Sequence, residues 1–284
     1  PKLAPVPYRA GPDDPRWMDA GEEWPAMERQ LAPLADTLAA IVYEPVLQGA
    51  GNMRLYSPDL LRRLRAWADA HGVYLIADEI AAGCHRLGPF LASHLASPSS
   101  LRASVPPYLP HFACLSKGLT GGFMPLSAVL TMQPIYDLFD ADYAEMKAFL
   151  HSNTYTGNAL AVAVANAALD VYREESIEAH VAAVGPSLRA GLADLARTRP
   201  YLHAVRGCGM MAAVDIRHPD GSPRPSADRT GYRVYREAVR RPRLGALLRP
   251  IGDTMYLLPP LNTEPRDVEA MLIILADSLD ATLR

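Results

Sequence analysis

Residues 73–79 read VYLIADE, an unbroken apolar run that ends in Asp78 and Glu79. Such a run is typical of a strand buried on both faces of a parallel sheet. Residues 38–46, LAAIVYEPV, predict a second strand of the same kind. Residues 57–72 between them predict a helix, with Ser57-Pro58 at its start and Gly72 at its end. Strand, helix and strand form a βαβ unit, so we expect a right-handed crossover and a parallel pair.

The rest of the chain continues this α/β pattern. Residues 112–115 and 126–132 are apolar runs that predict two more strands, and the nearly uniform apolar character of residues 159–172 predicts a buried helix. An amphipathic helix is expected over residues 187–196, entered through Gly185-Pro186. The remaining expected elements are strands over residues 210–216 and 255–258 and a final helix opened by Thr263 and Pro265.

Three regions are expected. Residues 1–37 are rich in proline, which fixes φ and removes a hydrogen-bond donor, so they predict an extended connector with at most a short helix. Residues 38–175 predict a large domain around a mostly parallel sheet. Residues 176–284 predict a smaller C-terminal α/β domain, because the pattern changes there from buried parallel strands to helices with shorter strands.

The composition describes a globular chain of 284 residues, 49% hydrophobic and 21% charged, which is long enough to bury a large core. The formal net charge of -3 gives no electrostatic reason to expect nucleic acid or an anionic membrane as a partner. We find no transmembrane run or signal peptide and expect a cytoplasmic protein. Three dispersed cysteines favour neither disulfides nor a structural metal site, and the arginine-rich residues 233–243 predict a solvated helix face with its loop.

Asp78 and Lys117 are the most informative polar residues. Asp78 ends a predicted strand, where we expect it to be buried, and Lys117 follows another. The carboxyl ends of parallel strands lie at one edge of a sheet. A lysine in a desolvated place becomes a nucleophilic amine, and a desolvated carboxylate needs a cationic partner. Pyridoxal phosphate chemistry uses both, an amine for the aldehyde and an acid that keeps the pyridine nitrogen protonated. Three nearby glycines would let the backbone pass close to such a ring, namely Gly118, Gly121 and Gly122.

The same residues allow two other interpretations. Asp78 and Glu79 also fit a strand-end pair that faces solvent, with Lys117 as an ordinary loop lysine. An apolar run followed by Asp-Glu is also found in nucleotide-dependent ATPases, where it holds magnesium. The ATPase interpretation lacks a G-x-x-x-x-G-K-[ST] loop, and Lys117 precedes its glycines instead of following them. From the residues alone, the solvent-facing pair stays open beside the cofactor site.

Five separated motifs resemble the class III aminotransferases of fold type I. They are EPVLQGAGNMRLY at residues 44–56, LIADEIAAG at 75–83, LSKGLTGG at 115–122, HSNTYTGNA at 151–159, and RPIG at 249–252 with Tyr256. The motifs follow the family's order over residues 38–284. The resemblance implies an α/β fold of type I, pyridoxal 5'-phosphate as cofactor, an amino donor and a keto acid as small-molecule substrates, and a homodimer with a shared active site.

The resemblance also implies roles for individual residues. Lys117 matches the lysine that binds the cofactor aldehyde and moves a proton, and Asp78 matches the partner of the pyridine nitrogen. Ile80 matches the apolar residue on the ring face, and Thr154 matches the residue that reaches the phosphate of the neighbouring subunit's cofactor. Arg249 matches the arginine that pairs with a substrate carboxylate, for which a planar bidentate fork is suited. The other residues implied to contact substrates are Tyr256, Arg86 and Ser152.

Departures from the family pattern bear on the substrates. Relatives that act on ornithine or 4-aminobutyrate resemble E-P-I-Q-x-E and carry glutamine after D-E-I, whereas this chain has Gln48-Gly49-Ala50 and Ala81. At both positions the chain resembles the enzymes of biotin biosynthesis. This resemblance implies amino transfer from S-adenosylmethionine to 8-amino-7-oxononanoate, giving 7,8-diaminononanoate. Another class III ω-aminotransferase and a chain without catalytic function are the alternatives.

Two motifs are less regular. The usual F-G-R-T-G is CHRLG at residues 84–88, which bears on Arg86, and the usual G-P-T is Ser152-Asn153-Thr154, which bears on the amino donor.

The family's Gly-Ser loop for the cofactor phosphate and its ring-stacking aromatic residue precede the strand that begins here at Leu38, and residues 1–37 contain neither. Because a phosphate dianion binds backbone N–H groups at a helix start, we expect the large domain to be N-terminally incomplete.

Overall fold

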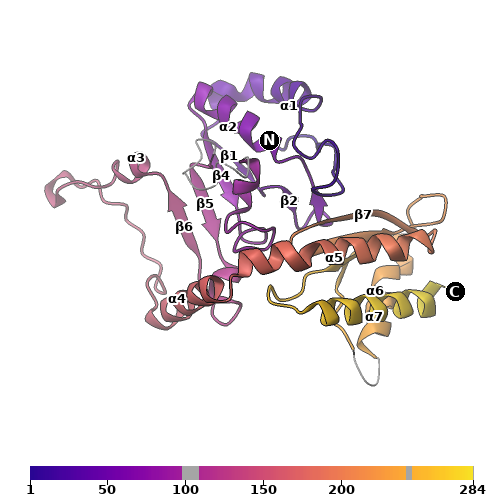
Figure 1. Ribbon diagram of the computed structural model, residues 1–284. Helices are drawn as coiled ribbons and strands as arrows, with labels where there is room; N and C mark the ends of the chain where they lie inside the picture. The colour runs from indigo at the N-terminus through magenta and orange to yellow at the C-terminus, as the bar shows by residue number, and fades with distance from the viewer. Residues whose placement is uncertain (98–108, 241–244, 284) are drawn as a thin grey trace.

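The computed structural model of the protein describes residues 1–97, 109–240 and 245–283. These residues form two regions, each with its own sheet and buried core (Figure 1). The boundary predicted at residue 176 falls between α4 (Ala159–Glu174) and α5 (Ile177–Arg197), and the core of the second region contains residues from Ile177 onward. Within the described ranges, no helix has both the length and the apolar character needed to cross a membrane.

The sheet of the first region has four strands in the order β1-β4-β5-β6. β1 (Ala40–Tyr43), β4 (Tyr74–Asp78) and β5 (Phe112–Leu115) are parallel, and β6 (Ala128–Thr131) runs antiparallel beside β5. The crossover from β1 to β4 contains α2 (Asp59–His71), which ends where Gly72 adopts the left-handed conformation at φ 64°. The predicted βαβ unit is therefore confirmed, with β1 ending before Glu44-Pro45.

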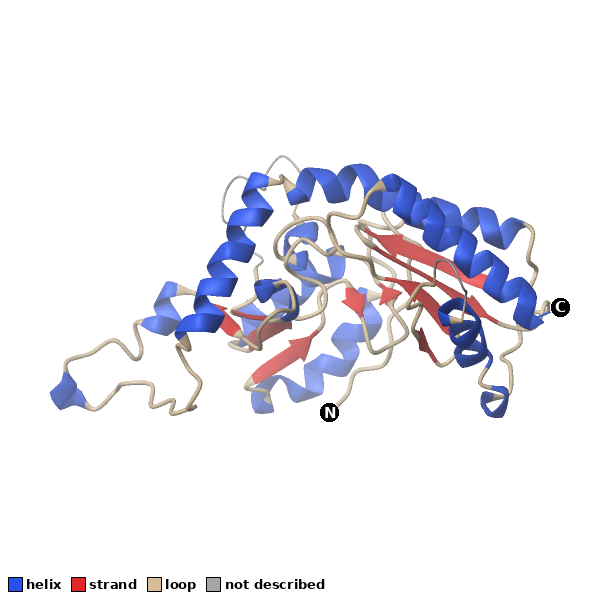
Figure 2. Ribbon diagram, turned by 90° about the horizontal axis from the view of Figure 1, so that it is seen from below, coloured by secondary structure: helices blue, strands red, loops and turns tan. Residues whose placement is uncertain are grey.

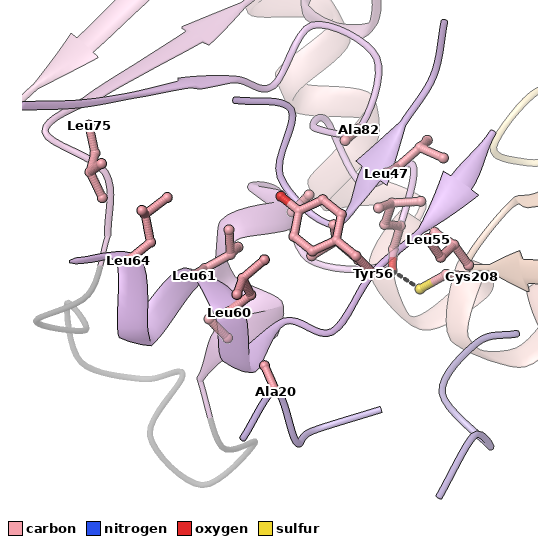
Figure 3. Close-up of a cluster of buried hydrophobic side chains, with 14 of the residues drawn as sticks. Ala20, Leu47, Leu55, Tyr56, Leu60, Leu61, Leu64, Leu75, Ala82 and Cys208 are labelled. Atoms are coloured by element: carbon pink, nitrogen blue, oxygen red, sulfur yellow. Dashed lines mark hydrogen bonds between the residues drawn. The ribbon is translucent and has the colours of Figure 1, made fainter. Parts of the chain in front are cut away.

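Residues 1–37 pack against this first region. They contain α1 (Trp24–Leu31), which is the short helix that the sequence allowed, and the 3-10 turn η1 (Ala32–Thr37). Arg9 bridges to Leu55 in the hairpin of β2 (Leu47–Gln48) and β3 (Arg54–Leu55). Figure 3 shows Ala20 next to the leucines of α2. The residues of this segment that are buried in the first core are Trp17, Ala20, Met27 and Leu31, so the segment is packed rather than fully extended.

A long arm, residues 132–158, leaves the first region after β6. It runs through α3 (Gln133–Tyr136) and η5 (Tyr143–Glu145) to the start of α4, and Figures 1 and 2 show it projecting from the body of the molecule. Residues 136–157 are exposed. The prediction that residues 159–172 form a buried helix is wrong in its burial, because Leu160 is 71% exposed and α4 buries only Ala161 and Ala165.

The second region is built on an antiparallel sheet of order β7-β8-β10-β9. Its core draws on α5 and on α7, which contribute Leu188 and Leu275 among others. The predicted strands near 210–216 and 255–258 and the predicted final helix are confirmed, whereas β7 was not expected. The elements after α5 are β7 (Leu202–Cys208), β8 (Met211–Ile216), η6 (Ser226–Asp228), α6 (Thr230–Val239), β9 (Pro250–Ile251), β10 (Thr254–Leu257) and α7 (Pro265–Leu283).

The start of α5 differs from the expectation. The helix begins at Ile177, and Pro186 lies inside it instead of opening it. Gly185 packs so closely on the β7–β8 turn that a Cβ there would lie 2.5 Å from the carbonyl oxygen of Gly209. Gly185-Pro186 therefore marks a close helix-to-sheet approach and not a helix start. Of the arginine-rich segment, Arg233, Arg236 and Arg240 are exposed, and Arg241 and Arg243 lie outside the described residues.

Candidate active site

Asp78 and Lys117 lie at the same edge of the first sheet. Asp78 is the last residue of β4 and pairs in register with Cys114 of β5. Lys117 follows β5 closely and opens the 3-10 turn η4 (Lys117–Thr120). Both residues therefore stand at the carboxyl ends of neighbouring parallel strands, which is where sheets of this kind bind ligands.

A third ionisable residue, Glu44, belongs to this edge and was not predicted as a site residue. It directly follows β1, and the parallel register of β1 and β4 brings it beside Asp78. Its carboxylate accepts a hydrogen bond from the Gly49 N–H at 2.7 Å. Burial raises the pKa of Glu44 although the Gly49 N–H lowers it, and the charges of Asp78 and Lys117 add smaller, opposing effects. The three charges therefore act on one another, and the strand-end position of Glu44 was the signal that could have identified it.

The two carboxylates of the Asp78-Glu79 pair have different surroundings. Asp78 is half-buried and accepts a hydrogen bond from the Ile80 N–H at 3.0 Å. Glu79 is buried and accepts hydrogen bonds from the N–H groups of Ala92 and Ser93 and from the Ser93 hydroxyl, which fixes the start of η2 (Ala92–Ala96). The expected buried carboxylate was Asp78, and this expectation is wrong: the buried one is Glu79. The interpretation of a pair facing solvent is equally wrong for Glu79, and Asp78 is the carboxylate that a ligand can reach.

The backbone around Lys117 is held on both sides. Lys117 has a φ of 40°, which is uncommon for a residue with a Cβ. The Ser116 hydroxyl donates to the carbonyl oxygen of Leu126 at 2.7 Å, and the Thr120 hydroxyl donates to that of Met124 at 2.6 Å. The Lys117 side chain itself is exposed, so the expectation of a desolvated lysine is wrong for this chain. The turn thus presents an accessible amine from a backbone that is fixed by bonds to the next loop.

The glycines after Lys117 serve the turn more than a ligand. Gly121 and Gly122 have φ values of 59° and 85°, which glycine adopts without strain. A Cβ at Gly118 would lie 2.6 Å from the Cβ of Cys84. Gly118 therefore makes room for Cys84. We expected this glycine to make room for a cofactor ring, and the close contact in the structure is with the cysteine side chain instead.

The chemistry of the strand-end groups fits the ring of pyridoxal phosphate. An amine suits its aldehyde, and a carboxylate suits its pyridine nitrogen, and Lys117 and Asp78 supply these on adjacent strands. Ile80 is half-buried two residues after Asp78 and supplies an apolar side chain at the same edge. The chain therefore offers one group for the aldehyde of the cofactor and one for its pyridine nitrogen.

Arg249 and Tyr256 are brought together by the second sheet. β9 and β10 pair Pro250 with Met255, and the same register continued by one residue sets Arg249 opposite Tyr256. Arg249 is exposed and lines a cavity of about 530 Å³ with Arg229 and other residues. Tyr256 packs against the core of the first region. The second sheet thus sets Arg249 and Tyr256 across from each other, and their implied contact with a substrate stays a prediction.

Arg86 joins the two regions. Its guanidinium donates to the carbonyl oxygens of Met210 at 3.0 Å and Pro259 at 2.6 Å, both in the second region. Burial lowers the pKa of Arg86 to about 10, so the group stays charged at neutral pH. These bonds occupy one guanidinium nitrogen, and the implied contact of Arg86 with a substrate stays a prediction.

Ser152 and Thr154 lie on the arm, and both are exposed. The chain here is ordered by local bonds, because Asn153 accepts from the Tyr155 N–H and Asn158 caps α4 by accepting from two N–H groups of its first turn. An exposed threonine on a projecting arm suits binding to another subunit. Its implied role at the neighbouring subunit's cofactor stays a prediction.

A strand-end amine and carboxylate on a mainly parallel sheet, followed by a second α/β region, suit a scaffold that binds pyridoxal phosphate. The chain matches the family "Aminotransferase class-III" over residues 2–279 and belongs to that family. It is 36% identical over 252 residues to the adenosylmethionine-8-amino-7-oxononanoate aminotransferase of Nitratidesulfovibrio vulgaris, covering 87% of this chain and 43% of that protein.

Solved structures agree with this assignment. The crystal structure of adenosylmethionine-8-amino-7-oxononanoate aminotransferase from Methanocaldococcus jannaschii superposes with a TM-score of 0.82 at 26% identity, covering 92% of this chain and 57% of that one. An amine transaminase from an uncultivated Pseudomonas species, solved in its PLP-bound form, superposes with a TM-score of 0.78 at 34% identity, covering 90% of this chain and 55% of that one. The predicted α/β fold of type I is confirmed. The chain spans about half the length of the relatives it matches.

Proposed function

We propose that this chain belongs to an aminotransferase that uses pyridoxal 5'-phosphate to move an amino group from S-adenosylmethionine to 8-amino-7-oxononanoate. The observation that supports the proposal is the position of Lys117 and Asp78 at the ends of adjacent parallel strands, inside motifs of the class III family. Support for the substrates comes from the similarity to enzymes named for this reaction, at 36% identity in two bacteria. The enzyme would act in the cytoplasm.

The residues of the chain divide the work at the cofactor. Bound pyridoxal phosphate supplies an aldehyde and a pyridine ring that accepts electrons from the substrate. The Lys117 amine would hold the aldehyde carbon and, once displaced by the substrate amine, would carry the proton between substrate and cofactor carbons. The Asp78 carboxylate would hold the proton on the pyridine nitrogen, and Ile80 would keep water from the ring face. Glu44 would place a second carboxylate near this amine.

The second region would bind the far end of the acceptor. 8-Amino-7-oxononanoate has a carboxylate separated from its ketone by an alkyl chain. Arg249 offers the planar guanidinium that pairs with a carboxylate in two hydrogen bonds. Tyr256, opposite it on β10 and packed against the first core, would line the path of the alkyl chain between the two sites. Arg86 and Ser152 would complete the substrate pocket.

A homodimer with shared active sites is part of the proposal. The arm carries large apolar side chains in water, among them Tyr143 at 93% and Leu150 at 89% exposed. An apolar surface of this kind indicates a protein partner. A second copy of the chain would cover it, and the arm would bring Thr154 to the phosphate of the cofactor held by the other copy.

Lysine mapping tests the proposal directly. The chain contains three lysines, Lys2, Lys117 and Lys147. The protein expressed from its complete gene is loaded with pyridoxal phosphate, reduced with borohydride and digested. We expect the covalent label on the peptide that contains Lys117. A label on Lys2 or Lys147, or no label at all, would contradict the proposal, and no label would favour a chain without catalytic function.

An amine transaminase of different substrate range is the second candidate. It is favoured by the 34% identity to the amine transaminase structure, which is close to the identity with the biotin-pathway relatives. Both candidates use the same cofactor residues and differ in the substrate pocket. A panel of amino donors separates them: S-adenosylmethionine as the best donor supports the first, and simple primary amines as the best donors support the second.

A further inference from the structure

The Lys117 turn is hydrogen-bonded by a side chain that the family motifs do not include. Tyr172, near the end of α4, donates its hydroxyl hydrogen to the carbonyl oxygen of Gly118 at 2.5 Å. Gly118 directly follows Lys117, whose φ of 40° is in the left-handed region that residues with a Cβ rarely adopt. The hydroxyl therefore bonds to the residue next to Lys117, in addition to the bonds that Ser116 and Thr120 make to the next loop.

The surroundings of Tyr172 keep this bond in place. Burial raises the pKa of Tyr172 to about 12, so the hydroxyl stays protonated and remains a donor at neutral pH. The ring of His85 meets that of Tyr172 edge-on, with centroids 5.4 Å apart, and the His85 Nδ1 bonds to the Gly88 carbonyl oxygen at 2.9 Å. The tyrosine ring is thus oriented by a histidine that is itself tied to its own loop.

The CHRLG segment fits the same arrangement. At the position of Gly118, an added Cβ would lie 3.3 Å from both the Cys84 Sγ and the Tyr172 hydroxyl oxygen. A cysteine at residue 84, where the family usually has phenylalanine, is small enough to leave the space that the hydroxyl occupies. The departures at residues 84 and 85 and the presence of Tyr172 therefore belong to one packed group against the lysine turn.

We propose that Tyr172 is a positioning residue for Lys117, acting through the Gly118 carbonyl. This inference rests on the proposed function, since it assigns the orientation of the amine that binds the cofactor. Through α4 the tyrosine is also continuous with the arm that precedes the helix at Asn158. The helix therefore connects the arm to the lysine turn, and Tyr172 supplies a hydrogen bond within that contact.

The test is Tyr172→Phe in the protein expressed from its complete gene, because this change removes the hydroxyl and keeps the ring against His85. In the cofactor-free protein, we expect amide hydrogen exchange in residues 116–121 to speed up by about 2- to 10-fold, as for the loss of one hydrogen bond. In the loaded enzyme, kcat should fall by roughly tenfold while the KM values of both substrates stay within about twofold, since misplacement of a reacting group affects the chemical step.

A matched control is Tyr201→Phe. Tyr201 donates to Asp280 at 3.3 Å in the second region and is half-buried like Tyr172, so it loses a comparable bond far from the turn. Exchange in residues 116–121 and kcat should not change in this variant. A second change, Gly118→Ala, pushes the same carbonyl from the Cys84 side and should reproduce the kcat loss with unchanged KM.

The outcomes separate the two proposals. If the wild type carries its cofactor on Lys117 and Tyr172→Phe leaves both exchange and kcat unchanged, the positioning role is overturned and the proposed function stands. If Tyr172→Phe raises KM as much as it lowers kcat, the tyrosine is a general structural residue and the positioning role is again overturned. If the wild type binds no cofactor at Lys117, the proposed function fails, and the exchange experiment still decides whether Tyr172 fixes the lysine turn.

Discussion

The strand-end edge of the first sheet and the arm differ in how their positions are determined. At the edge, Glu44, Asp78 and Lys117 lie at the carboxyl ends of three adjacent parallel strands, and the sheet register sets Glu44 beside Asp78. On the arm, Ser152 and Thr154 are exposed, and the neighbouring Asn153 bonds only locally, to the Tyr155 N–H. The edge is defined within one chain, whereas the arm is exposed in one chain and would be covered only in the proposed dimer. Substitutions at the edge and substitutions on the arm should therefore have different effects on the cofactor.

The largest effect is expected at Lys117. Lys117→Ala removes the amine that both binds the cofactor and carries the proton, so activity should fall by at least about 10³-fold. The visible absorbance of lysine-bound cofactor should disappear, as measured by spectrophotometry and borohydride labelling. Lys2→Ala is the control, because Lys2 is exposed near the chain start, and it should keep full activity. An alanine variant that still labels after borohydride would remove Lys117 from the site.

The next effect is expected at Asp78. Asp78→Asn keeps the shape of the side chain and removes the charge that would stabilise a protonated pyridine nitrogen, so kcat should fall by about 10²-fold. Labelling at Lys117 should persist, because the amine is unchanged. A variant with wild-type kcat would show that the carboxylate does not serve the ring, and Glu44→Gln in the same assay would show whether the neighbouring carboxylate does.

These residues also show what sequence could predict. The βαβ unit and the strand ends follow from short-range apolar patterns, and the structure confirms them. The roles of Asp78 and Lys117 come from the family resemblance and stay predictions. The burial of Glu79 in place of Asp78 did not follow, because it depends on the N–H groups of Ala92 and Ser93, which lie thirteen and fourteen residues downstream. Side-chain partners of that kind are set by tertiary packing.

Glu44 and the arm were harder to predict for related reasons. Glu44 has no special local pattern, and its role at the edge becomes visible only once β1 is placed beside β4. The apolar character of α4 predicted burial, but one chain leaves most of that surface open. Exposed apolar residues predict that a surface will be buried. They do not predict whether the same chain or a partner buries it.

Glu79 tests how far the edge depends on its scaffold. Glu79→Gln replaces one accepting oxygen by an amide NH₂, which opposes the Ala92 or Ser93 N–H, so the free energy of unfolding should drop by about 1–3 kcal/mol. Chemical denaturation measures it. Glu145→Gln on the arm is the control: Glu145 pairs with Lys147 in water, and its loss should change stability by less than about 0.5 kcal/mol. Equal losses in the two variants would contradict the contrast between edge and arm.

The same residue predicts a pH dependence. Burial raises the pKa of Glu79 above its ordinary value of 4.5. Between the unfolded and the folded pKa, the folded protein binds the proton more readily, so this group makes stability fall as pH rises above 4.5. Glu79→Gln cannot titrate and should show a shallower fall over that range in denaturation measured at several pH values. An unchanged slope would mean that Glu79 keeps an unshifted pKa in the fold.

The smallest effect is expected on the arm, at Thr154. Thr154→Ala removes one hydroxyl from the proposed phosphate contact, so cofactor affinity should fall by about tenfold, while labelling at Lys117 persists at saturating cofactor. Equilibrium dialysis of the cofactor measures this. Ser187→Ala is the control, since the Ser187 hydroxyl bonds within α5 to the Val184 carbonyl oxygen. Equal affinity in wild type and Thr154→Ala would exclude the threonine from the phosphate site.

Mixed dimers decide whether Thr154 acts on its own copy or on the other. In a dimer of one Lys117→Ala copy and one Thr154→Ala copy, a shared arrangement gives one site with both changes and one site with neither. The mixed dimer should then recover about half of the wild-type activity at low cofactor concentration, where each parent dimer is poorly active. If Thr154 served its own copy, one site would lack the lysine and the other the threonine, and activity at low cofactor would stay low. The ratio of activities at low and high cofactor therefore reports directly which copy the arm completes.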